Sequence, residues 1–305
     1  MKKALISLLA VAISLVTNGQ ILKERRVYYL DCSYSMVSPN GIWEKVKSSL
    51  IEAINDVSDQ TTELIVIPFA LDSNGTTKVF SNVATEKGKA TLVNQINTIV
   101  PNNTSMTYLG IPMNDFMNNR IAPARVTYMF FMTDGQNEQK PDPMPGLLSS
   151  WGQKYGDKNI FGFYVVLDQA AKNPTYSKII AKQPHLWEVQ TADVNVNLIR
   201  LDNKAVFNAK ADKYIDLTVY GNDKGVKYTA SFNETVPYKV DKVIRENKKL
   251  RVYVSCKAGQ TPTASQSCTL KIKANGLGKY DFLVTESITV TCECKPERVL
   301  KIKVK

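Results

Sequence analysis

Between residues 25 and 202, short apolar runs alternate with segments in which apolar residues recur every three or four positions. The runs lack a polar–apolar alternation, so they indicate strands buried on both faces of a parallel sheet. The amphipathic segments indicate helices that cover such a sheet on both sides. We predict strands at 27–30, 63–69, 77–83 (an edge strand), 126–133, 160–167 and 186–190, and helices near 43–57, 86–99 (capped by Thr85), 108–120, 147–155, 174–182 and 193–201.

From about residue 205 the hydrophobic period changes to two. Polar and apolar residues alternate in seven or eight short segments, for example around Ile215, Leu250 and Leu270, and again at 300–304. Alternation marks strands with one buried and one solvated face, and many such strands in succession favour an antiparallel β-sandwich. We place the boundary near 202–206. This gives two domains, an α/β domain over 20–204 and an Ig-like sandwich over 205–305.

Residues 1–19 have the pattern of a secretory signal peptide. Lys2 and Lys3 precede a largely apolar stretch over 4–16, and small residues precede a cut before Gln20. The stretch is too short to span a bilayer, so cleavage is favoured over anchoring. We therefore expect an exported mature protein in the periplasm, at the cell surface or outside the cell, without a transmembrane segment.

The formal net charge is +11, from 39 Lys and Arg against 28 Asp and Glu, and it is unevenly distributed. Residues 20–204 carry 18 basic and 18 acidic side chains, whereas residues 205–305 carry 19 and 10. Such asymmetry can indicate contact with an acidic polysaccharide, lipid or nucleic acid. Because the lysines alternate with apolar residues, a solvated strand face with lysines for solubility and edge protection is favoured. No specific nucleic-acid partner is predicted.

Three short polar motifs stand where predicted strands end or helices begin. D-x-S-x-S begins at Asp31 after the first strand, T-x-L-G begins at Thr107 ahead of the third helix, and T-D-G with Asp134 follows the most apolar strand. Open parallel sheets bind ligands at the carboxyl ends of their strands, where the strand order reverses. If the first and fourth strands are neighbours there, Asp31 and Asp134 face each other.

Carboxylates and hydroxyls in these motifs are hard oxygen ligands, which suit Mg²⁺, Mn²⁺ or Ca²⁺. His185 is the one histidine of the chain, so a multi-histidine metal site is excluded and Ser-His-Asp catalysis is disfavoured. A ligand set rich in neutral hydroxyls leaves the ion electrophilic. The ion would then accept a carboxylate from outside the domain.

The order strand, D-x-S-x-S, helix, T-x-L-G, helix, apolar strand, T-D-G resembles the von Willebrand factor A domain with its metal-ion-dependent adhesion site. The resemblance covers about residues 25–202 and implies a doubly wound, mostly parallel six-stranded sheet with the metal at its top. By position, the family's coordinating residues correspond to Asp31, Ser33, Ser35, Thr107 and Asp134. The family often has Gly-Gly before the threonine, where this chain has Ser105 and Met106, and Thr104 is an alternative to Thr107.

In the family, the serines and the threonine bind the ion directly when a ligand is present, and one or both aspartates act through water. The resemblance therefore implies a Mg²⁺-dependent (or Mn²⁺/Ca²⁺-dependent) adhesion or protein-binding module and not an enzyme, and the signal-peptide pattern predicts that it is exported. An acidic side chain of a protein partner would complete the metal shell. Gln136, Asn137 and Glu138 would line the rim or form a plain polar loop.

The alternative function is a metal-dependent hydrolase of phosphates or esters that uses Asp31 as its nucleophile. Enzymes of that kind usually need a second acid two residues on, where this chain has Ser33. The sequence also has no phosphate-binding G-x-x-x-x-G-K-[ST] loop. Binding is therefore favoured over catalysis.

The cysteines divide into one in the first motif and four in the C-terminal region. Cys32 is predicted to be a buried free thiol. In an exported protein the other four indicate two disulfides, and Cys292 and Cys294 would each pair with Cys256 or Cys268. A zinc site of all four is the alternative, disfavoured because C-x-C lacks the usual ligand spacing.

Overall fold

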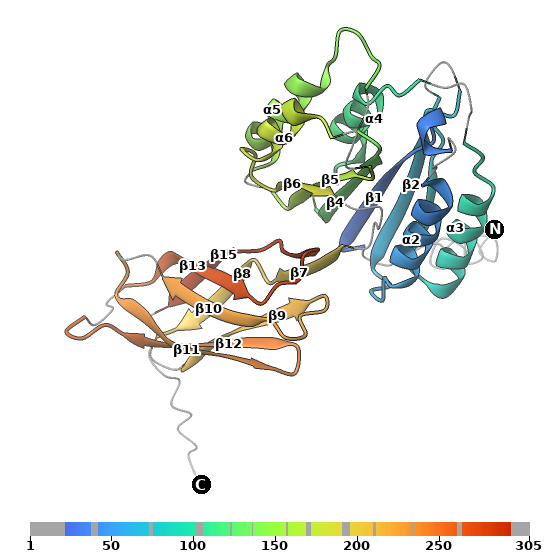
Figure 1. The fold of residues 1–305 in the computed structure, drawn as a ribbon. Helices are drawn as coiled ribbons and strands as arrows, with labels where there is room; N and C mark the ends of the chain where they lie inside the picture. The colour runs from blue at the N-terminus through green and yellow to red at the C-terminus, as the bar shows by residue number, and fades with distance from the viewer. Residues whose placement is uncertain are drawn as a thin grey trace, which may run out of the picture. The chain divides into compact units, whose positions relative to one another are not determined.

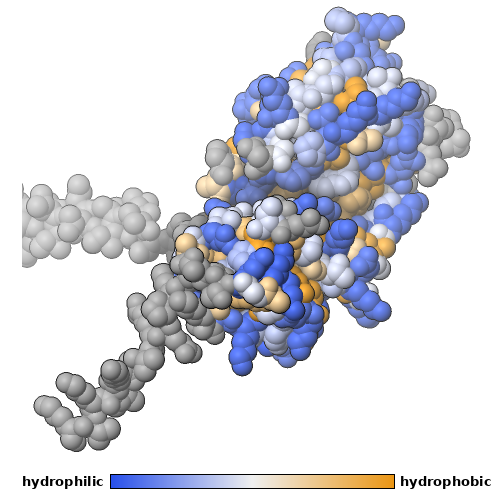
Figure 2. Space-filling view, turned by 90° about the vertical axis from the view of Figure 1, so that its left-hand side faces the viewer, coloured by the Kyte–Doolittle hydropathy of each residue, from blue (hydrophilic) through white to orange (hydrophobic). Residues whose placement is uncertain are grey.

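The computed structural model describes residues 22–37, 42–72, 76–101, 106–122, 124–135, 137–156, 158–168, 172–190, 196–209, 212–232, 235–260 and 264–293. The predicted signal peptide and the predicted strand at 300–304 lie outside these residues. The chain divides into two compact units, Met1–Asn195 and Val196–Lys305 (Figure 1). None of the described helices has the length and apolar content that a membrane crossing requires. Hydrophilic residues predominate on the side of the molecule shown in Figure 2, with hydrophobic residues in smaller areas between them.

The first unit contains a six-stranded sheet in the order β3-β2-β1-β4-β5-β6. Its strands are β1 (Glu24–Asp31), β2 (Thr62–Phe69), β3 (Phe80–Val83), β4 (Val126–Thr133), β5 (Ile160–Val166) and β6 (Leu186–Gln190). Strand β3 is antiparallel to β2, and the other neighbours are parallel. The predicted strands and the predicted mostly parallel α/β sheet are confirmed. The strand order reverses between β1 and β4.

Helices cover both faces of this sheet (Figure 1). On one face lie α2 (Trp43–Asn55) and α3 (Glu86–Asn97), and on the other lie α4 (Gly110–Asp115), α5 (Met144–Tyr155) and α6 (Pro174–Ile180). The predicted cap of α3 is confirmed, because the backbone N–H of Gly88 donates to Thr85 Oγ1 at 3.1 Å. Helix α4 continues into a π-helical turn, η2 (Phe116–Arg120).

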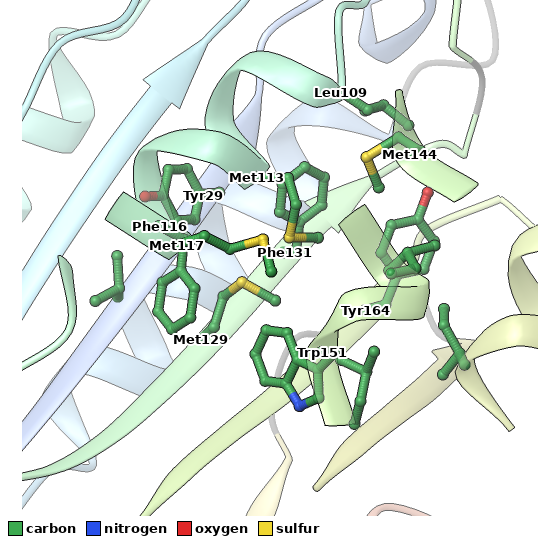
Figure 3. Close-up of a cluster of buried hydrophobic side chains, with 14 of the residues drawn as sticks. Tyr29, Leu109, Met113, Phe116, Met117, Met129, Phe131, Met144, Trp151 and Tyr164 are labelled. Atoms are coloured by element: carbon green, nitrogen blue, oxygen red, sulfur yellow. The ribbon is translucent and has the colours of Figure 1, made fainter. Parts of the chain in front are cut away.

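Aromatic side chains in register hold the strands together. On one face a row of rings crosses four strands, with centroid separations of 4.7, 5.3 and 5.1 Å between Tyr28, Phe130, Phe163 and Trp187. The opposite face packs against α4, η2 and α5, and here Trp151 of α5 stacks on Phe116 of η2 at 5.8 Å (Figure 3). Offset aromatic stacking adds to the free energy of burial, so the row across the sheet supports the strand register on which the site depends.

The second unit consists of two sheets, in the orders β10-β13-β15-β8 and β11-β12-β9-β7-β14. The strands are β7 (Asn197–Leu201), β8 (Lys204–Asn208), β9 (Tyr214–Tyr220), β10 (Lys227–Phe232), β11 (Tyr238–Glu246), β12 (Lys249–Cys256), β13 (Gln266–Asn275), β14 (Asp281–Leu283) and β15 (Ser287–Glu293). Both sheets contribute to one hydrophobic core, for example Leu270 and Ile288 from the first and Leu217 and Leu250 from the second. The Ig-like classification stays a prediction.

Two expectations for this region are wrong. The segment predicted as a helix over 193–201 contains strand β7, which pairs with β9 and β14. Its closely spaced apolar residues fit either period, and the pairing with distant strands decides the outcome. The sheets are also not purely antiparallel, since β8 runs parallel to β15 and β7 runs parallel to β14. The unit accordingly begins at Val196, whereas the sequence pattern placed the boundary near 202–206.

Two of the predicted disulfide cysteines lie side by side in the core of the second unit. The Sγ atoms of Cys268 and Cys292 are 3.0 Å apart on neighbouring strands, whereas a disulfide bond is about 2.05 Å long. Cys256 is exposed, and Cys294 lies outside the described residues. Among the described residues, which exclude Cys294, no three His, Cys, Asp or Glu side chains gather as metal ligands.

We predict that Cys268 and Cys292 form a disulfide when the protein is purified without reductant. Closing a loop of this length stabilises a domain by about 3 kcal/mol, so reduction should lower the melting temperature of the second unit. Peptide mass spectrometry after alkylation of the unfolded, unreduced protein checks the pairing, with Cys256→Ser as a control that keeps it. Alkylation of both thiols would contradict the prediction.

Gly162 gives a second prediction about packing. A Cβ at this position would lie 2.8 Å from the Trp151 ring and 2.6 Å from Leu186 Cδ1. Gly162→Ala should therefore destabilise the first unit by about 1–3 kcal/mol, the usual cost of overpacking. Gly146→Ala is the matched control, because a Cβ there meets nothing within 4 Å and alanine favours a helix over glycine. Equal urea midpoints for the two variants would contradict this packing.

Candidate metal centre

Two acidic side chains meet at the carboxyl ends of β1 and β4. Asp31 is the last residue of β1 and fully buried, and Asp134 directly follows β4 and is 4% exposed. Leu30 pairs with Met132 in the sheet, which brings Asp31 beside Thr133. The Thr133 hydroxyl donates to Asp31 Oδ2 at 2.7 Å. The predicted approach of the two motifs across the reversal of strand order is thus present.

The loop after β1 is folded around the Asp31 carboxylate. The Ser33 N–H donates to Asp31 Oδ1 at 2.9 Å, which bends the chain as an Asx turn does. A short 3₁₀ turn, η1 (Tyr34–Met36), follows, and the hydroxyl oxygens of Ser33 and Ser35 lie 3.1 Å apart. Alternate residues of D-x-S-x-S therefore gather on one side of the loop.

Cys32, which lies between Asp31 and Ser33 in the sequence, is a buried free thiol, as predicted. Its N–H donates to Phe69 O at 3.0 Å, and its Sγ lies 3.5 Å from Leu30 O. Burial raises the pKa of the Cys32 thiol well above its usual value. A thiol held protonated is a poor nucleophile and a poor metal ligand.

Gly135 turns the chain after Asp134. Its φ of +97° lies in the left-handed region that favours glycine. Its N–H donates to Thr133 Oγ1 at 3.1 Å, and that same hydroxyl donates to Asp31. The T-D-G motif therefore fixes both the turn and the position of the Asp31 carboxylate.

Thr107 is buried and is held by the loop that follows Asp134. Its N–H donates to Glu138 Oε2 at 2.8 Å, and the Glu138 N–H donates to Thr107 O at 2.9 Å. The Leu109 N–H donates to Asn137 Oδ1 at 3.1 Å. The sequence left open whether Asn137 and Glu138 line a ligand rim or form a plain polar loop, and the structure shows that both bind the backbone of the threonine loop. No local sequence signal indicates these contacts, because they join residues about thirty positions apart.

Thr104, the alternative to Thr107, and Gln136, the third candidate rim residue, lie outside the described residues.

The site is electrostatically unfavourable to two negative charges. The pKa of Asp31 is raised to about 7, mainly by burial and in addition by the charge of Asp134, while hydrogen bonds from Ser33 and Thr133 oppose the shift. The principal groups that act on Asp31 are thus acidic or neutral. A bound cation would favour the ionised form of both carboxylates.

The hydroxyl geometry fits a small, hard divalent cation. Two oxygen ligands at right angles, each about 2.1 Å from Mg²⁺, are about 3 Å apart, and the Ser33–Ser35 separation is 3.1 Å. The donor set of carboxylates and hydroxyls is of the kind that Mg²⁺, Mn²⁺ and Ca²⁺ prefer. The residues that could hold such an ion are Asp31, Ser33, Ser35, Thr107 and Asp134.

No protein-family model and no curated protein matches this chain. Among solved structures, it is similar to a von Willebrand factor type A protein from Catenulispora acidiphila, with 14% identity, a TM-score of 0.43, and coverage of 89% of this chain and 67% of that one. It is also similar to manganese-loaded TRAP protein of Plasmodium vivax, with 13% identity, a TM-score of 0.42, and coverage of 90% and 96%.

A third similar structure is proximal thread matrix protein 1 from the mussel byssus, with 14% identity, a TM-score of 0.42, and coverage of 62% of this chain. The chain spans about half of that protein, 54% of its length. One structure of the mussel protein has a zinc-occupied MIDAS motif. At these identities and scores a shared function does not follow, so the assignment of function rests on the residues of this chain.

The carboxylate pair predicts a pH dependence of stability in the metal-free protein. The pKa of Asp31 rises from 3.8 to about 7 on folding, so the folded state binds more protons than the unfolded state between these values. The free energy of unfolding then falls as the pH rises from about 4 to 7. In chelator, the free energy of unfolding of the wild type should fall across this pH window by on the order of a few kcal/mol relative to that of Asp31→Asn. Urea unfolding at pH 5 and pH 8 measures the difference, and parallel pH profiles would contradict it.

Proposed function

We propose that the α/β unit is a divalent-cation-dependent binding module of the von Willebrand factor A type. Asp31, Ser33, Ser35, Thr107 and Asp134 hold the ion, with Mg²⁺, Mn²⁺ or Ca²⁺ as the candidates. The observation that carries the proposal is the juxtaposition of the buried Asp31 with Ser33 and Thr133 at the reversal of strand order, beside Asp134.

The chemistry of the ligand set supports binding of an acidic partner. Two carboxylates at most neutralise a divalent ion, and three neutral hydroxyls leave its remaining positions attractive to an anion. A carboxylate from a protein partner is the fitting ligand. The predicted export of the chain agrees with such an adhesion or protein-binding role.

The contacts of Asp31 favour binding over catalysis. Its two carboxylate oxygens accept hydrogen bonds from the Ser33 N–H and the Thr133 hydroxyl, and its side chain is fully buried. A nucleophilic carboxylate needs an oxygen that a substrate can approach. We therefore place Asp31 as a support of the ion and not as the nucleophile of a hydrolase.

Metal binding is tested by thermal unfolding of the chelator-treated protein with added Mg²⁺, Mn²⁺ or Ca²⁺. An ion that binds only the folded state stabilises it by about 2.7 kcal/mol at a hundred times Kd. We expect a rise in melting temperature that Ser33→Ala and Asp134→Asn abolish. Ser150→Ala is the matched control, a serine of the same unit whose hydroxyl bonds Leu147 O. A rise retained in Ser33→Ala and Asp134→Asn would overturn the assignment.

Partner binding is tested with two peptide pools that differ in one position, Asp in one and Asn in the other. The Mn²⁺-loaded protein should retain the Asp pool, and chelator should release it, because the acidic side chain completes the ion's shell. Equal retention of both pools, or retention in chelator, would contradict the role of the metal. Metal-dependent turnover of phosphate or ester substrates that is lost in Asp31→Ala would favour the hydrolase.

A further inference from the structure

The outward side of the sheet β10-β13-β15-β8 carries lysines and hydroxyl side chains. Its inward side contributes Leu270 and Ile288 to the core, and the two-residue period of strands sends the intervening side chains outward. The exposed lysines are Lys204, Lys227, Lys271 and Lys273. We name this surface the lysine face. Its hydroxyl residues, exposed except for the half-buried Thr269, are Thr229, Ser231, Ser267, Thr269, Ser287, Thr289 and Thr291.

Strand register interleaves the two kinds of side chain. The cross-strand rows are Thr229–Lys273, Ser231–Lys271–Ser287 and Thr269–Thr289–Lys204. Neighbouring strands are about 4.8 Å apart, and side chains on one side of a strand repeat about every 7 Å. A polymer lying across this surface would meet ammonium groups and hydroxyls at the spacing of successive sugar units.

The positive charges of the four lysines on the lysine face are not paired with carboxylates in the described part of the same domain. Among the described residues, none of its four lysines has a carboxylate within ion-pair distance. The other sheet differs, since Arg251 pairs with Asp216 at 3.1 Å and with Glu246 at 2.9 Å. One carboxylate, Glu293, occupies an outward position at the end of β15, opposite Asn208 of β8, and Glu286 directly precedes that strand. The positive charge of the face is therefore available to an external anion.

Edge protection does not account for this charge. Lysines on edge strands discourage pairing with another chain, and Lys204 and Lys227 lie on the edge strands β8 and β10. Lys271 and Lys273 lie on β13, which is hydrogen-bonded to a strand on each side. Their position calls for another explanation.

The side chains of the face select among acidic partners. Its outward positions in the four strands include no aromatic ring, so bases of single-stranded nucleic acid have nothing to stack on. Its one large exposed hydrophobic is Val206, 64% exposed on an edge strand, which gives little to insert into a membrane. Hydroxyls between ammonium groups can exchange hydrogen bonds with sugar hydroxyls while the lysines contact the acidic groups.

We propose that the lysine face binds an acidic polysaccharide, a glycan chain that bears carboxylate or sulfate groups. This surface belongs to the second unit and is independent of the cation site between β1 and β4. Binding should therefore persist in chelator, so that its failure and the failure of the metal-dependent function can be told apart.

The first test measures binding of the purified protein, in chelator, to immobilised heparin and polygalacturonate, with neutral dextran as the blank. Lys271→Gln with Lys273→Gln should weaken binding at least tenfold and reduce its salt dependence. The matched control is Lys239→Gln with Lys249→Gln, which removes the same charge from exposed lysines paired with Asp241 and Asp216 on the other sheet. The control should weaken binding less than twofold.

Three outcomes would overturn the proposal. The first is absence of binding to both acidic polymers, and the second is equal weakening by the two double variants, which would indicate non-specific attraction. The third is tighter, Lys271- and Lys273-dependent binding to vesicles of anionic lipid or to duplex DNA. A melting temperature close to wild type confirms that both double variants are folded.

A second pair of variants tests the hydroxyls without changing the charge. Thr229→Val with Thr289→Val keeps the shape of each side chain and removes two hydroxyl groups. We expect polygalacturonate binding to fall severalfold while its salt dependence stays as in wild type. Unchanged affinity would mean that the face attracts the polymer by charge alone, which would contradict the assignment to a polysaccharide.

Discussion

The burial of the Asp31 carboxylate beside a second carboxylate is the constraint on which the candidate site depends. Asp31 and Asp134 lie at the ends of neighbouring parallel strands, and the burial of Asp31 together with the charge of Asp134 raises the pKa of Asp31 to about 7. A protein gains no stability from such an arrangement in the absence of a cation. Its presence at the reversal of strand order, beside the hydroxyls of Ser33 and Ser35, is what the proposed divalent-cation site would account for.

The fold holds this arrangement through contacts far apart in sequence. The pairing of β1 with β4, supported by an aromatic row across the sheet, brings Thr133 to Asp31, and the Glu138 carboxylate binds the backbone of Thr107. Thr133 and Glu138 are among the polar residues that make these contacts. They position the ligand oxygens, which is the usual role of residues behind a metal's direct ligands.

Much of the first unit's fold and of the candidate site can be predicted from the sequence, because buried strands and polar motifs are recognisable in short segments of it. The apolar runs locate the six strands of the first unit, and D-x-S-x-S and T-D-G mark two strand ends. Features that depend on pairing between distant segments leave no such signal. The helix predicted at 193–201 is a strand, two strand pairs of the second unit are parallel, and the Glu138–Thr107 contact has no motif. The gathering of lysines on one face likewise emerges only when β13 and its neighbours pair.

The most direct test of the central claim is anomalous diffraction from crystals of the protein soaked in Mn²⁺. The account predicts a peak about 2.0–2.3 Å from the hydroxyl oxygens of Ser33, Ser35 and Thr107, with Asp31 and Asp134 adjacent or linked through water. A peak elsewhere on the molecule, or its absence from this site at saturating Mn²⁺, would contradict a metal centre between β1 and β4.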